Sequence, residues 1–206
     1  MRVTADTKSK TRQRILEAAR NLFSKKGFDE STTRDIAAEA GVATGTLFNY
    51  FPSKEALGMS LVAQALEDAE ADFRAKRRGD EPLEELLFAY IATGLRALAP
   101  YREAVGPIVE SGLSPFSADS GSLGEQLRAA HLEAVAGLIG EHKGVPKPSF
   151  VAMHLYWSLY LGVLAFWSSD ASPNQEDTLV VLDQSLRLFV ASLNSSASTE
   201  EVSRGT

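Results

Sequence analysis

The sequence of 206 residues contains no cysteine, and this absence removes several classes of protein from consideration. Without thiols the chain has no disulfide framework, no cysteine nucleophile and no zinc site of a cysteine-containing kind. Its three histidines, His131, His142 and His154, lie at separations that match no zinc-binding motif. The P-loop, the serine-hydrolase elbow and the dinucleotide-binding glycine motif are also missing. We therefore expect no catalytic site, no metal site and no cofactor.

The features of a secreted or membrane-spanning protein are equally scarce. The N-terminal stretch has no apolar core, so it does not resemble a secretory signal. Residues 150–167 carry no formally charged side chain, which raises the possibility of a membrane span. That run is at the minimum length, includes His154 and Ser158, and lacks basic flanks. We interpret it as a helix buried on several sides, and we expect a cytoplasmic protein without membrane contact.

Apolar residues recur at helical spacing along most of the chain, and no stretch alternates convincingly enough to form a strand. The predicted fold class is therefore all-α, with about nine helices. Breaks in the pattern divide the chain into an N-terminal unit of residues 1–54, a connecting helix from 54 to about 76, a second unit of residues 77–194, and a polar, disordered tail of residues 195–206.

Charge is distributed unevenly between these units, although the net charge of the chain is −6. Up to Lys54 there are ten Lys/Arg and six Asp/Glu, a balance of +4. From Glu55 onward there are eleven Lys/Arg and twenty-one Asp/Glu, a balance of −10. A basic N-terminal unit on an acidic remainder is the pattern expected when only the former meets phosphate groups.

Residues 33–54 predict two short helices joined by a tight turn. Thr32 can cap the first helix, with Asp35 completing a capping box. Gly41 is placed to adopt the left-handed conformation that ends a helix, because it has no Cβ. A second helix follows from about Thr44, and its outward side chains are hydroxyls, an amide and aromatic rings. This arrangement favours a helix-turn-helix element that reads DNA.

The run GVATGTLFNYFPSKEAL, residues 41–57, resembles the signature of the tetracycline-repressor (TetR) family, G-V-x-x-x-T-[LIV]-Y-x-[HY]-F-x-x-K-x-x-L. The similarity extends upstream and covers roughly residues 10 to 60. Phe48 stands where the family usually has tyrosine, so a phosphate contact from that hydroxyl is lost while ring packing against the sugar remains. The resemblance implies an N-terminal three-helix helix-turn-helix DNA-binding domain and a C-terminal helical domain for ligand binding and dimerisation.

Matching the motif position by position assigns roles within the DNA-binding unit. Base or flanking phosphate contacts are expected from the start and outer face of the second helix, and backbone contacts from the residues around it. The recognition helix has no Arg or Gln, so bidentate base readout rests on Asn49, and thymine methyl groups and DNA shape carry more of the specificity. The predicted DNA-contacting residues are Thr33, Thr44, Gly45, Thr46, Phe48, Asn49, Tyr50 and Lys54.

The resemblance also implies an effector pocket in the acidic domain and a homodimer formed by the last two helices, about 149–168 and 176–193. The candidate pocket residues are Tyr90, Phe116, His154, Trp157, Tyr160 and Trp167, each of which could instead belong to the core or the dimer interface. Few cations lie near this aromatic stretch, so we expect a largely apolar or aromatic effector rather than a highly anionic one.

The function predicted from these features is a ligand-responsive, homodimeric transcriptional repressor that binds a palindromic operator. Repressor is preferred to activator by resemblance alone. An enzyme is the competing class, and it has no supporting motif. A third alternative is a helical adaptor that binds protein through a degenerate helix-turn-helix, for which binding would be insensitive to salt and no DNA complex would form.

Overall fold

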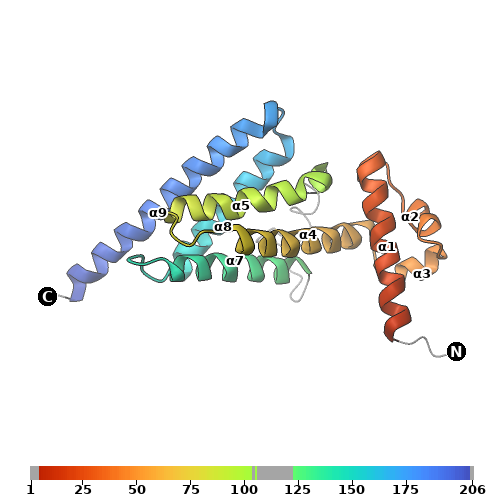
Figure 1. The fold of residues 1–206 in the computed structure, drawn as a ribbon, viewed down its shortest axis with the longest axis horizontal. Coiled ribbons are helices and arrows are strands. Elements are labelled where there is room, and N and C mark those ends of the chain that lie inside the picture. Colours follow the sequence, from red (N-terminus) through yellow and green to blue (C-terminus); the bar gives the residue numbers. More distant parts are fainter. Residues whose placement is uncertain (1–4, 104, 106–122, 205–206) are drawn as a thin grey trace.

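The computed structural model describes residues 5–103, 105 and 123–204. Within these ranges the chain forms eight α-helices and two 3₁₀ helices and contains no strand, which confirms the predicted all-α class (Figure 1). The helices are α1 (Ala5–Lys26), α2 (Thr33–Glu39), α3 (Thr44–Phe48), α4 (Lys54–Lys76), α5 (Leu83–Leu98), α7 (Leu123–Glu141), α8 (Phe150–Ser169) and α9 (Glu176–Arg204), with η1 (Ala99–Tyr101) and η3 (Pro173–Gln175) between them.

The molecule consists of a small head, α1 to α3, and a larger body that contains α5 and α7 to α9 (Figure 1). Helix α4 joins them: its first turns pack on α1, and its remaining turns pack on α5 and α7. Helices α2 and α3 lie on the side of α1 that faces away from the body (Figure 1). The short helices of the head are therefore at one extreme end of the molecule.

Helix starts in this chain are set by hydroxyl side chains. The side-chain oxygens of Thr32, Ser53 and Ser149 accept the amide N–H of the residue three positions on, each at 3.1 Å. An N-cap bond of this kind typically contributes about 1 kcal/mol. Thr32 was predicted as a cap, and the bonds of Thr32 and Ser53 fix where α2 and α4 begin.

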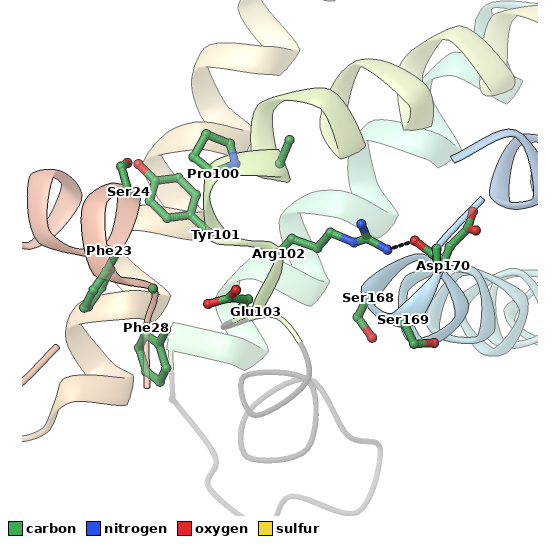
Figure 2. Close-up of a pocket in the computed structure, with 13 residues that line it drawn as sticks. Phe23, Ser24, Phe28, Pro100, Tyr101, Arg102, Glu103, Ser168, Ser169 and Asp170 are labelled. Atoms are coloured by element: carbon green, nitrogen blue, oxygen red, sulfur yellow. Dashed lines mark hydrogen bonds between the residues drawn. The ribbon is translucent and has the colours of Figure 1, made fainter. Parts of the chain in front are cut away.

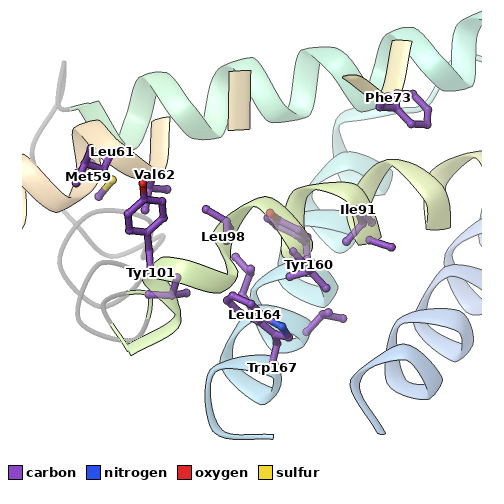
Figure 3. Packing of buried hydrophobic residues seen from close by; sticks show 14 of the residues in the cluster. Met59, Leu61, Val62, Phe73, Ile91, Leu98, Tyr101, Tyr160, Leu164 and Trp167 are labelled. Atoms are coloured by element: carbon purple, nitrogen blue, oxygen red, sulfur yellow. The ribbon is translucent and has the colours of Figure 1, made fainter. Parts of the chain in front are cut away.

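The body is held together by apolar stripes at helical spacing. On α5 the buried side chains include Leu87, Ile91 and Leu95, and those on α9 include Leu186 and Phe189. Figure 3 shows the part of this core between α4, α5 and α8, with Tyr101 pointing from η1 toward α4. Burial of such side chains stabilises the fold by roughly 1.5–3 kcal/mol each.

Helix α8 meets the length and composition requirements of a membrane span, but a core helix of a soluble protein passes the same test. Its inner face is buried through Tyr156, Trp157, Tyr160 and Trp167, and it packs against α9. Its outer face is apolar and exposed, most strongly at Phe150, which is 85% exposed. This helix thus has one face in the core and a second apolar face without a partner in the described chain.

Two element boundaries differ from the sequence expectation. The second helix of the helix-turn-helix has only five residues and is followed by the turn residues Asn49 and Tyr50. The last helix continues to Arg204, whereas we expected a disordered tail from residue 195. The polar composition of that segment indicated disorder, yet it has no glycine or proline before Gly205 to interrupt a helix that is already formed.

Candidate nucleic-acid interface and effector site

The turn between α2 and α3 is built by backbone geometry. Gly41 has φ +66°, the left-handed region that a Cβ disfavours. This conformation lets the N–H of Gly41 bond to the carbonyl oxygen of Ala38 at 3.1 Å and that of Val42 to Ala37 at 2.9 Å. The helix therefore ends within two residues, and the side chain of Val42 turns onto the core.

Helix α3 is too short to be stable alone, so packing holds it in place. Leu47 and, just beyond the helix, Phe51 are buried anchors. Around these anchors Gly45, Phe48 and Asn49 are exposed, whereas Thr44, Thr46 and Tyr50 are half-buried and Tyr50 packs against the core. All six are predicted DNA contacts, and each is at least partly accessible to solvent.

The other two predicted contacts flank α3. Thr33 is the first residue of α2 and is half-buried. The Lys54 ammonium, at the start of α4, donates to the carbonyl oxygens of Phe28 at 2.8 Å and Asp29 at 3.3 Å. It also lies 4.3 Å from the centroid of the Phe28 ring. Lys54 therefore ties α4 to the turn after α1, a role that the sequence did not indicate.

The head carries exposed arginines on α1 and α2. The Arg12 guanidinium of α1 lies 5.2 Å from the centroid of the Phe51 ring, next to the end of α3. Arg14 and Arg34 are exposed as well, and none of the three forms an ion pair within the described residues. Helix α3 is thus accompanied by positive charge on α1 and α2, which suits a polyanion.

The second candidate site is a group of aromatic side chains inside the body. Five aromatic side chains from three helices pack together, and we call them the aromatic cluster. They are Tyr90 of α5, His131 of α7, and Tyr156, Trp157 and Tyr160 of α8. The His131 ring is at its centre, with centroid distances of 4.2 Å to Tyr160, 5.5 Å to Tyr90, 5.7 Å to Tyr156 and 6.0 Å to Trp157. The Nε2 atom of His131 also shares a hydrogen bond of 2.8 Å with the Tyr156 hydroxyl.

Burial controls the ionisation of this cluster. It lowers the pKa of His131 well below the ordinary value, because the imidazolium would lose its hydration, so the ring is neutral at pH 7. The same desolvation raises the pKa values of Tyr156, Tyr160 and Tyr90. The five side chains therefore offer uncharged rings with polar tips.

Comparison with known proteins identifies the head. Residues 15–58, from α1 to the first turn of α4, match the family described as bacterial regulatory proteins, tetR family. The head belongs to the TetR family. This confirms the resemblance predicted from residues 41–57 and explains why the head has this three-helix form.

Individual curated relatives match part of the chain. The transcriptional regulator UidR of Escherichia coli K12 is 41% identical over 78 residues, 38% of this chain and 37% of UidR. The transcriptional repressor KstR of Mycolicibacterium smegmatis is 38% identical over 86 residues, 41% of this chain and 42% of KstR. The matches thus span less than half the length of these curated relatives.

Among solved structures the similarity covers most of the chain. FadR of Thermus thermophilus, a TetR-family transcriptional repressor solved in complex with lauroyl-CoA, superposes with a TM-score of 0.68. The two are 25% identical, and the match covers 87% of this chain and 93% of FadR. Because the match covers most of both chains, head and body together share the overall fold of FadR.

The predicted effector residues do not all come together in the body. Tyr90, Trp157 and Tyr160 meet in the aromatic cluster. His154 is exposed and stacks on Phe150 at 6.3 Å, on the outer face of α8, while Phe116 lies outside the described residues. The sequence reasoning missed His131, although His131 shares the inward spacing of Leu127 and Val135.

Trp167 lies ten residues after Trp157, and the residues that follow it, 168–170, line a cleft of about 840 Å³ between head and body (Figure 2). Its indole N–H donates to the Gln175 side chain at 2.8 Å. The Arg102 guanidinium, which lines this cleft, bonds to the carbonyl oxygens of Trp167 and Asp170. Arg102 therefore already links the chain after α5 to the end of α8 through these hydrogen bonds.

Proposed function

We propose that this protein is a homodimeric transcriptional repressor that binds a palindromic operator through α2 and α3 and is released by a small, largely apolar or aromatic effector. The observation that carries the proposal is the accessibility of six predicted contacts in residues 44–50, a segment held in place by the two buried anchors Leu47 and Phe51. Such a protein acts in the cytoplasm, where its DNA is.

The contacts are assigned by position. Thr44, Gly45, Thr46 and Asn49 would meet bases or the adjacent phosphates, and Asn49 alone can make a bidentate contact with adenine. Thr33, Tyr50 and Lys54 would orient the head on the backbone, and the Phe48 ring would pack on sugar. One head buries too little surface for tight binding, so two heads about one helical turn apart are needed, which implies a palindrome.

The apolar outer faces of α8 and α9 support the dimer. Val151, Leu155 and Phe166 are exposed on α8, and Val180 and Leu188 on α9. A monomer rarely leaves so many large apolar side chains on adjacent helices in water. A second copy would cover them by forming a four-helix interface, as we expected for residues 149–168 and 176–193.

Effector binding is assigned to the body. Support comes from the aromatic cluster, because it contains three of the candidate residues, and from FadR, whose similar structure holds lauroyl-CoA. A ligand would release DNA only by binding more tightly to the conformation that does not fit the operator.

The experiment is binding of the purified protein to the intergenic DNA upstream of its own gene, measured from low to high salt. We expect a saturable complex of two chains per site with a steep loss of affinity as salt rises, because phosphate contacts release counterions. Asn49→Ala should reduce discrimination among operator variants by about 1–3 kcal/mol.

The adaptor alternative makes the opposite prediction. If selection from random duplexes, together with the upstream DNA, yields no complex at low salt from a folded dimer, the repressor proposal is wrong. Binding of a protein partner that does not respond to salt would then favour the adaptor.

A further inference from the structure

The two tryptophans of α8 differ in one respect that bears on ligand binding. Trp157 is 1% exposed, and its indole nitrogen has no hydrogen-bond partner among the described residues. Trp167 is equally buried, yet its indole N–H donates to Gln175. A buried donor without an acceptor costs about 1–3 kcal/mol, so the Trp157 N–H is a site where an incoming acceptor gains binding energy.

The space around the aromatic cluster is almost closed. Two voids of about 10 Å³ each lie on either side of Tyr160 and Ile91, which line both. One is bounded by α4, α5, α7 and α8, and the other by α5, α8 and α9. Each has room for at most one water molecule. A larger molecule can enter only by displacing a ring, and the Tyr160 ring lines both voids.

The charges around the cluster disfavour an ionised ligand. His131 and the tyrosines are neutral, as described above. Glu70 lines the void between α4, α5, α7 and α8, which we call the first void, and it already forms an ion pair with Arg74 at 2.7 Å. Arg128 is half-buried, and its guanidinium lies over the Trp157 ring at 5.5 Å. A charged group that entered the cluster would lose its hydration free energy, and the neutral rings would replace little of it. An uncharged acceptor would instead accept a hydrogen bond from the Trp157 N–H.

The geometry points to the aromatic cluster as a cryptic site for an uncharged, planar aromatic molecule with one hydrogen-bond acceptor, which accepts from Trp157 and occupies the position of the Tyr160 ring. This inference rests on the proposed function only in taking the molecule to be the effector. Planar rings fit because the cluster already holds stacked ones, with the His131 and Tyr160 planes 20° apart. Leu66, Ala69 and Glu70 of α4 line the first void, so the ligand would contact the helix that leads to the head.

Three naphthalenes of similar size separate the contributions: 2-acetylnaphthalene carries a neutral acceptor, 2-ethylnaphthalene has no acceptor, and 2-naphthoate has a charged one. Binding is measured by calorimetry on the full chain without DNA, so the result does not depend on whether the protein binds an operator. We expect 2-acetylnaphthalene to bind roughly two- to tenfold more tightly than 2-ethylnaphthalene, the effect of one net hydrogen bond. The naphthoate should bind most weakly.

Trp157→Phe keeps a ring but removes the donor, so it should abolish the preference for the acetyl over the ethyl compound. Trp167→Phe is the matched control, since it makes the same change in the same helix at a satisfied indole, and it should retain the preference. Equal affinities of the two neutral compounds for the unaltered protein, or no binding of either, would overturn the inference. Tightest binding of the naphthoate would also overturn it and would indicate a carboxylate site at Arg128. Release of DNA by the acetyl compound is measured separately and tests its role as effector.

Discussion

Gly27 and Gly41 both have a left-handed backbone but differ in their surroundings. Their φ angles are +83° and +66°. A Cβ on Gly27 would lie 2.5 Å from the Glu103 Oε2 atom, whereas one on Gly41 would meet nothing within 4 Å. Glu103 is exposed, so its carboxylate can move aside at little cost. Backbone strain should therefore dominate at both positions.

We expect Gly27→Ala and Gly41→Ala to lower the free energy of unfolding by similar amounts, about 1–2 kcal/mol. Denaturant titration measures both. Adding Glu103→Ala to Gly27→Ala should restore little of the loss. Recovery of most of it would show that Glu103 is held rigidly against the head.

Lys54 has three N–H donors, of which two bond to the carbonyl oxygens of Phe28 and Asp29, leaving one for a phosphate. Lys54→Met should therefore have two effects. The midpoint of thermal unfolding should fall by a few degrees because the tie is lost. The slope of log affinity for DNA against log salt should fall by about one.

Lys26→Met is the comparison for Lys54, because Lys26 is exposed and only pairs with Asp35 at 3.8 Å. It should change the midpoint little. If Lys54→Met lowers the unfolding midpoint but leaves the salt slope unchanged, Lys54 supports the head without contacting phosphate.

Helix α8 carries its exposed stripe on Val151, Leu155, Ser158, Gly162 and Phe166. A Cβ on Gly162 would meet nothing within 4 Å, so a larger side chain is tolerated in one chain by itself. In a dimer packed through this face, the same side chain would separate the helices. We predict that Gly162→Leu raises the dimer dissociation constant at least tenfold, since overpacking costs about 1–3 kcal/mol.

Sedimentation measures that constant, and Gly137→Leu is the matched control. Gly137 is an exposed glycine of α7 that likewise has open space around it. Both substitutions should favour their helix by somewhat under 1 kcal/mol, and only Gly162→Leu should affect association. Equal association of the two variants would place the interface elsewhere.

The connection from α8 to α9 depends on Asp170. Its carboxylate accepts from the Thr178 hydroxyl at 2.6 Å, from the Thr178 N–H at 2.9 Å and from the Ser172 N–H at 2.8 Å. These bonds, led by that from the Thr178 hydroxyl, hold the pKa of Asp170 below its ordinary value. A lowered folded pKa stabilises the protein above the unfolded pKa, and the stabilisation is lost as the pH falls toward the folded value.

Asp170→Asn should accordingly lower the unfolding midpoint by a few degrees at pH 7, and the gap to the unaltered protein should narrow below about pH 4. Thermal scans from pH 7 to pH 3 measure it. Asp183→Asn, which removes an exposed pair with Arg187, should have a small effect. A gap that stays constant with pH would mean that the carboxylate charge is unimportant.

Sequence alone predicted the head more completely than the body, for a physical reason. Caps such as Thr32 and the turn at Gly41 are local, so a short motif contains the whole geometry. The aromatic cluster combines residues from three helices, and only packing brings His131 to Trp157 and Tyr160. The length of α9 was missed because a polar composition shows only that a segment is compatible with solvent. It does not show whether a helix that has already formed continues through that segment.

For the whole molecule, association and folding are linked. If the outer faces of α8 and α9 are buried only in the dimer, the dimer is the stable folded form, and the unfolding midpoint must rise with protein concentration. We expect a rise of a few degrees over a hundredfold range. Gly162→Leu should flatten this dependence, and a midpoint that never varies would indicate a monomer.

In the proposed homodimer, helix α4 would act as a lever. It has 23 residues in one uninterrupted helix. From the void beside Ala69 to Lys54 at the head it extends about 22 Å at its usual rise per residue. A tilt of about 5° about the void therefore moves each head by ~2 Å, and two heads moving apart change their separation by ~4 Å, more than the rise of one base pair. A change in head separation equal to the thickness of one aromatic ring would therefore place the second head out of register with its half-site.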